Sequence, residues 1–147
     1  ALNQWLVDNY PQHSKAKGAL QQLVTDVHQR EGAGEALNEL ERRAPKVGLD
    51  GWALDRTRAN LLSQSGRHEE AREIYWRRES ERGIAAHNRA SAMFWRAYSF
   101  QQEGRKEEAM AVYRQVIAEY GESKEPGVDS SGGGARNQLE KLEKRGR

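Results

Sequence analysis

The sequence predicts an all-α protein in which antiparallel helical hairpins stack into an α-solenoid. Charged and helix-forming residues dominate the 147-residue chain, which contains only three prolines and few clusters of strand-forming residues. One pattern also occurs twice, at residues 66–75 and again at residues 104–113. We call the shift that carries Gly66 onto Gly104 the repeat step. Internal repetition at a period of this size is typical of stacked helical units.

Each copy has the features of a turn followed by the second helix of a hairpin. Gly66 and Gly104 end the preceding helices, because glycine adopts the left-handed conformation at little cost. A pair of glutamates then opens the next helix at the positive end of its dipole. Further along that helix, a small residue and an aromatic four positions later share one face, which allows a close helix contact. These pairs are Ala71 with Tyr75 and Ala109 with Tyr113.

The first part of the chain predicts a partial helix and a degenerate hairpin. The stripe of Leu2, Trp5 and Leu6 should end before Pro11, because the residue before a proline avoids the helical region. It resembles the second half of a hairpin. Residues 14–48 then carry two helical stripes separated by the turn at residues 31–34, the first beginning near Ser14, a plausible cap.

The rest of the chain predicts two regular hairpins, a loop and a terminal helix in one domain. Residues 124–134 are rich in serine and glycine, a composition that indicates a flexible loop whose shortening changes stability little. In the following helix Leu139 and Leu142 share one face, as in a helix that caps a solenoid. The expected parts are therefore 1–11, 14–48, 52–85, 90–123, the loop 124–134 and the capping helix 135–147.

Charge and composition exclude some functions. The net charge is only +2, although 17 of the 24 basic residues are arginine, and this balance gives weak support for nucleic-acid binding. No apolar run is long enough for a transmembrane helix. The absence of cysteine excludes disulfides and thiolate metal sites but does not fix the cellular compartment.

The two regular hairpins resemble tetratricopeptide repeats. The residues that carry the resemblance are the small residues of the first helices, the turn glycines, and the small and aromatic residues of the second helices: Ala59, Ala97, Gly66, Gly104, Ala71, Ala109, Tyr75 and Tyr113. The repeat step is longer than the family's usual period of roughly 34 residues and implies a longer connection between the hairpins. The resemblance implies a right-handed superhelix with a concave surface lined by the first helices. The end of the second repeat, residues 119–123, is similar to repeat ends in many bacterial proteins.

The resemblance also implies a non-catalytic scaffold, part of a larger chain or assembly, that binds a peptide or a partner protein in the concave groove. The expected contacts are first-helix residues that point away from the partner helix, namely Arg56, Asn60, Ser63, Gln64, Phe94, Tyr98 and Gln101. Arg56 and Asn60 are similar to part of a carboxylate clamp, and a solvated arginine beside a polar asparagine is the alternative interpretation.

The helix over residues 86–103 contains more large apolar residues than one stripe needs. Phe94 and Tyr98 are four apart, and an exposed aromatic pair of this kind is typical of an interface hot spot. The alternative is that both rings pack under the terminal helix or the loop after Gly121.

Catalytic and cofactor sites have little support in the sequence. The four histidines, at positions 13, 28, 68 and 87, do not have metal-ligand spacing, and we expect neither enzyme activity nor a cofactor. The remaining alternative function is an arginine-lined solenoid that binds nucleic acid. It requires one continuous basic stripe formed by Arg56, Arg58, Arg77, Arg78, Arg89 and Arg96.

Overall fold

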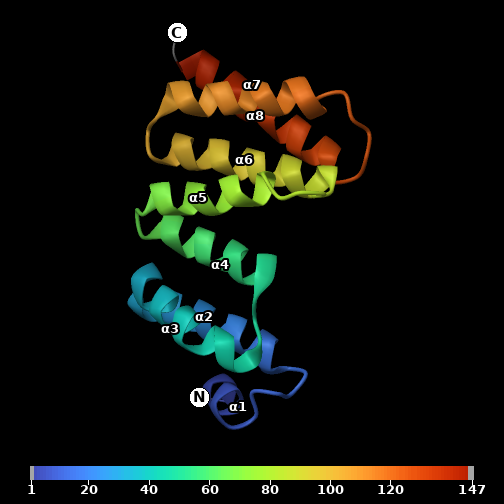
Figure 1. The fold of residues 1–147 in the computed structure, drawn as a ribbon. Helices are drawn as coiled ribbons and strands as arrows, with labels where there is room; N and C mark the ends of the chain where they lie inside the picture. Colours follow the sequence, from blue (N-terminus) through green and yellow to red (C-terminus); the bar gives the residue numbers. More distant parts are fainter. Residues whose placement is uncertain (1, 146–147) are drawn as a thin grey trace. The chain divides into compact units, whose positions relative to one another are not determined.

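The computed structural model describes residues 2–145, and these residues form eight helices and no strand (Figure 1). The prediction of an all-α helical repeat is therefore confirmed. The chain divides into two compact units, Ala1–Arg67 and His68–Arg147. The division falls inside the repeat predicted for residues 52–85. Each unit is described by itself.

The first unit consists of α1 (Leu2–Asn9), α2 (Ala16–Glu31), α3 (Ala33–Val47) and α4 (Gly51–Gln64). α2 and α3 form the central hairpin, α1 packs against α2, and α4 packs against α3. Gly32 alone separates α2 from α3, and its φ of 96° is one that side chains rarely tolerate. The sharp reversal brings Leu20, Val24 and Leu40 into a buried core.

The second unit consists of α5 (His68–Glu79), α6 (Ala86–Gln102), α7 (Lys106–Tyr120) and α8 (Val128–Arg145). α6 packs against α5 on one side and α7 on the other, and α8 lies against both α6 and α7 (Figure 1). The core between α6, α7 and α8 contains Met93, Ala97, Tyr113, Val116 and Leu142. The predicted close-contact residues Ala109 and Tyr113 are both fully buried.

The prediction of a flexible loop over residues 124–134 is wrong from Val128 onward. α8 begins at Val128, which is almost fully buried, and continues through the three glycines at 132–134. A Cβ at Gly132 would lie 3.1 Å from the Tyr120 carbonyl oxygen, and one at Gly134 would lie 3.0 Å from the Phe94 ring. These two glycines allow α8 to approach its neighbours closely, a packing role that composition alone does not reveal.

The repeat step continues into this terminal helix. Ala59, Ala97 and Ala135 stand one step apart on α4, α6 and α8, and all three are fully buried. An ion pair recurs at the same step, with Arg58 of α4 bound to Glu41 of α3 and Arg96 of α6 bound to Glu79 of α5. α8 therefore occupies the place of a repeat's first helix.

Candidate functional site

Four of the predicted binding residues lie on α4 in the first unit. Arg56, Asn60 and Gln64 are each four positions apart and are all exposed, and Ser63 is half-buried beside them. Gln64 Nε2 donates a hydrogen bond of 3.3 Å to Asn60 Oδ1. Within residues 2–145, Arg56 has no ion-pair partner. We call this set, Arg56, Asn60, Ser63 and Gln64, the α4 polar strip.

The other predicted residues lie on α6 in the second unit, where they contact their own neighbours. The Phe94 ring stacks on Tyr98 with centroids 6.4 Å apart and planes 6° apart, and it lies 5.7 Å from the Tyr113 ring. Gly134 of α8 is a further neighbour of this ring. Phe94 thus packs against the terminal helix, as the alternative interpretation expected, and Tyr98 remains half-buried beside it.

Gln101 connects three helices through hydrogen bonds. Its Oε1 accepts a bond of 2.8 Å from the Tyr113 hydroxyl of α7, and its Nε2 donates a bond of 3.1 Å to Gln138 Oε1 of α8. Burial raises the pKa of Tyr113 above its usual value, with a smaller contribution from Tyr98, so that the hydroxyl stays a donor. The idea that these residues and the α4 polar strip bind one partner stays a prediction.

Most of the arginines considered for a basic stripe are neutralised by carboxylates. Arg58 binds Glu41 and Asp55, Arg78 binds Glu81, Arg89 binds Glu119, and Arg96 binds Glu79. In the described part of the chain, only Arg56 and Arg77 of the six have no ion pair. The predicted arginines therefore supply little free positive charge for a phosphate backbone.

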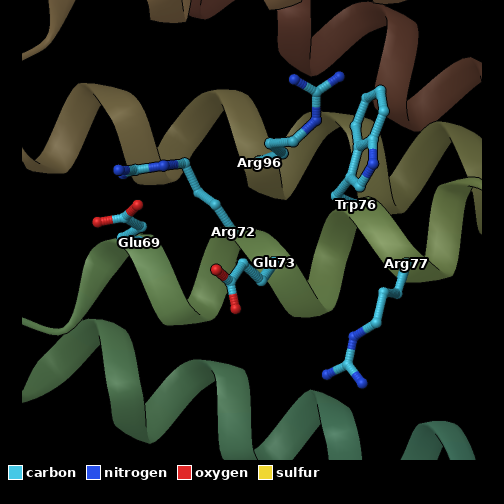
Figure 2. Close-up of a pocket in the computed structure, with 6 residues that line it drawn as sticks. All are labelled: Glu69, Arg72, Glu73, Trp76, Arg77 and Arg96. Atoms are coloured by element: carbon cyan, nitrogen blue, oxygen red, sulfur yellow. The ribbon is translucent and has the colours of Figure 1, made fainter.

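Sequence reasoning missed a pocket of about 660 Å³ between α5 and α6 (Figure 2). It is lined by one face of α5 and one residue of α6: Glu69, Arg72, Glu73, Trp76, Arg77 and Arg96. The available signal was Trp76, a large aromatic outside the buried stripe of Ala71, Ile74 and Tyr75. Trp76 is 56% exposed. We call this feature the α5–α6 pocket.

Two arginines of the α5–α6 pocket are paired with carboxylates and lie against aromatic rings. Arg72, which is itself buried, lies 2.6 Å from a Glu103 carboxylate oxygen, and its guanidinium carbon is 4.3 Å from the Phe100 ring centroid. Arg96 donates two hydrogen bonds of 2.8 Å to the Glu79 carboxylate. The same guanidinium lies 4.9 Å from the Trp76 ring centroid, within cation–π range.

The remaining charges of the pocket have no internal partner. Within residues 2–145, Glu69, Glu73 and Arg77 make no ion pair, and all three are exposed. Figure 2 shows the Arg77 side chain directed away from Trp76 and Arg96. The pocket thus combines an exposed indole, two neutralised arginines and three unpaired charges.

The described residues contain no cluster of three or more His, Asp or Glu that could hold a metal ion. None of their helices has both the length and the apolar character that a membrane crossing requires.

Comparison with known families gives one match. Residues 91–123 match the family model described as a tetratricopeptide repeat. The matched segment comprises α6 from Ser91 onward, all of α7 and the turn after it. No curated protein and no solved structure matches the chain.

Proposed function

We propose that this chain, whose residues 91–123 match the tetratricopeptide repeat model, is a scaffold module that binds a peptide or a partner protein. The main support is the match of residues 91–123 to the repeat model, together with the hairpin that α6 and α7 form at the same residues. Tetratricopeptide repeats are typically non-catalytic interaction modules, and stacked helical hairpins offer long exposed helix faces to a partner.

We propose the α4 polar strip as the partner-binding surface. Its three exposed members lie on one helix face, and the guanidinium of Arg56 is unpaired within the described residues. Arginine binds a carboxylate through two parallel hydrogen bonds, and a neighbouring amide adds a further donor. The strip therefore fits a carboxylate of the partner, supplied by an acidic side chain or a chain terminus.

The residues on α6 have a different role in this proposal. Phe94 packs against Gly134, and Gln101 is hydrogen-bonded to both Tyr113 and Gln138. We expect Phe94 and Gln101 to support the second unit, whereas Tyr98 is half-buried and adds only part of its ring to an exposed surface. Phe94→Ala should therefore lower stability, by less than the about 3–5 kcal/mol of a fully buried aromatic, because its ring is only partly buried.

The nucleic-acid alternative has less support. Arg58, Arg78, Arg89 and Arg96 are ion-paired, and the net charge of the chain is only +2. A protein that binds nucleic acid through phosphate contacts loses affinity steeply as salt rises. The alternative is supported if a labelled single strand or duplex binds with such a salt dependence.

Selection of binding peptides tests the proposed function. The intact chain is immobilised and used to select binders from a random peptide library. The affinity of each selected peptide is then measured for the wild type, for an α4 variant and for a control variant. We expect Arg56→Ala with Asn60→Ala to weaken binding at least tenfold, because truncation of a hot-spot arginine costs about 2 kcal/mol or more. The control Lys141→Ala changes an exposed residue of α8 and should leave affinity unchanged.

Melting curves separate lost binding from lost folding. The α4 substitutions change exposed side chains and should leave the melting temperature nearly unchanged. Failure to select any peptide that binds saturably would contradict the proposed function. Selected peptides whose affinity is equal for the α4 variant and the control would place the binding surface elsewhere.

A further inference from the structure

We propose that the α5–α6 pocket is a docking point for an arginine or lysine side chain of a protein partner. The proposal rests on the proposed function, because it names the chemistry of one partner contact. All of the lining residues belong to the second unit, and none of them is a member of the α4 polar strip.

Trp76 provides the platform for such a side chain. More than half of its surface is exposed, although an indole in water is costly compared with a buried one. Arg96 already lies over this ring at 4.9 Å, which shows that the ring accepts a guanidinium within the fold. The exposed part of the indole can accept a second cation from outside.

The charge balance of the pocket favours a cation over an anion. Arg72 and Arg96 are each matched by a carboxylate, Glu103 and Glu79 respectively. The lining then retains two carboxylates without an ion pair in the described chain, Glu69 and Glu73, against one such cation, Arg77. An acidic ligand would meet these two carboxylates, whereas a basic side chain would be attracted by both.

The two carboxylates also repel each other while the pocket is empty. Glu69 and Glu73 are four residues apart on α5 and thus face the same side of the helix. Like charges at this spacing destabilise a helix, and a cation placed between them removes that repulsion. A basic ligand is therefore favoured in two ways: the two carboxylates attract it, and its charge removes the repulsion between them.

The combination of two glutamates and a tryptophan occurs on α5 but not at the equivalent positions of the repeat. One repeat step later, α7 keeps a glutamate at Glu107 but has Ala111 and Arg114 in place of Glu73 and Trp76. One repeat step earlier, Glu31 and Glu35 are present, but Asn38 replaces the tryptophan. Among these three positions of the repeat, only α5 places two carboxylates beside an indole.

Arg77 is the lining cation whose charge opposes a basic ligand. It stands four residues after Glu73, a spacing at which a glutamate and an arginine can pair on a helix. In Figure 2 its side chain is directed away from the Trp76 ring. Removal of its charge should therefore strengthen binding of a basic side chain, a change opposite in sign to that expected for the glutamates.

Nuclear magnetic resonance of the indole N–H of Trp76 provides the test. The signal is assigned by its loss in Trp76→Phe, and the intact chain is titrated with N-acetylarginine amide, with the neutral N-acetylglutamine amide and with the acidic N-acetylglutamate amide. We expect a saturable shift of the Trp76 signal with the arginine probe only. Added salt should weaken the binding, because exposed charges are screened.

Charge variants then identify the origin of the binding. Glu69→Gln and Glu73→Gln should each weaken binding of the arginine probe about 1.5- to 5-fold, the range measured for exposed ion pairs. Arg77→Gln should strengthen it by a similar factor. The matched control Glu107→Gln, which changes the equivalent of Glu69 on α7, should have no effect.

Three results would overturn the proposal: no saturable shift with the arginine probe, an equal shift with the glutamine or glutamate probe, or equal affinity in Glu69→Gln, Glu73→Gln and the wild type. The proposed function fails separately, when no library peptide binds the chain. Library peptides that bind while the arginine probe does not would leave the proposed function standing and reject this pocket. Arginine- or lysine-rich peptides that move the Trp76 signal would support both.

Discussion

Two equivalent ion pairs, one repeat step apart, differ in how deeply they are buried. The Glu79 and Arg96 side chains are 4% and 12% exposed, whereas those of Glu41 and Arg58 are 46% and 26% exposed. Removing one partner of a buried pair leaves an uncompensated charge, which costs about 3–5 kcal/mol, and an exposed pair contributes about 0–1 kcal/mol. We therefore predict that Glu79→Gln destabilises the second unit by on the order of 3 kcal/mol and that Glu41→Gln has little effect.

Chemical unfolding of the two variants checks this prediction, with the midpoint and slope recorded for each. The Arg96→Met variant helps to interpret the result, because it leaves Glu79 buried without its partner and should be similarly destabilised. Equal, small losses for Glu79→Gln and Glu41→Gln would show that burial does not govern these pairs.

At single positions, the sequence predicted some contacts and missed others for a physical reason. Ala71, Tyr75, Ala109 and Tyr113 were expected to be buried from their spacing within one helix, and all four are. The surroundings of Phe94 and Gln101 depend on Gly134 and Gln138, which lie on α8, two helices further along the chain. The periodicity of one helix contains no information about such distant partners. The α5–α6 pocket was missed for a related reason, since Trp76 and Arg96 come from different helices.

At the scale of the helix, α8 shows how composition can mislead. Serines and glycines at residues 130–134 indicate a loop, yet they lie in the first turns of a packed helix. The informative signal was the repeat step, since the same shift that carries Ala59 onto Ala97 carries Ala97 onto Ala135. The repeat step therefore predicts a first helix here, although the segment itself has low intrinsic helix propensity.

The three consecutive glycines of α8 should respond differently to alanine. At Gly133 a Cβ would meet nothing within 4 Å, so Gly133→Ala should stabilise the protein by about 0.5–1 kcal/mol through helix propensity. At Gly132 a Cβ would be 3.1 Å from the Tyr120 carbonyl oxygen and 3.3 Å from Gly121 Cα, both of them backbone atoms. Backbone yields less readily than a side chain, so Gly132→Ala should be destabilising.

Thermal melts of the two alanine variants, with Gly134→Ala as a third, check this prediction. Gly134→Ala should fall between the other two, because its close neighbour is the ring of Phe94, a side chain that can shift. Equal gains in melting temperature at all three positions would indicate that α8 does not pack closely in solution.

At the scale of the whole molecule, the division into two compact units predicts that a substitution lowers stability mainly in its own unit. In repeat proteins each element contacts mainly its neighbours in sequence, so a local change affects nearby units most. Ala109 of α7 and Ala36 of α3 are both fully buried, and replacing either by leucine should cost about 1–3 kcal/mol through overpacking. We predict that Ala109→Leu lowers hydrogen-exchange protection in α6 to α8 and leaves α2 and α3 unchanged.

Residue-resolved hydrogen exchange on the intact chain measures this, with Ala36→Leu as the reciprocal variant. That change should lower protection in α2 and α3 and leave α6 to α8 as in the wild type. A uniform loss across all helices in both variants would mean that the chain unfolds as a single cooperative body.

The step that takes Ala59 to Ala97 and then to Ala135 also limits how such a chain can change its length during evolution. An insertion or deletion of one whole repeat step exchanges one first helix for the next and keeps a small residue at each equivalent position of the sequence. An exchange that is one residue too short or too long would bring the adjacent side chain, such as Arg58 or Arg96, to the place where an alanine is needed. Tandem duplication and loss in whole steps is therefore the route by which this architecture can be lengthened or shortened while it stays folded.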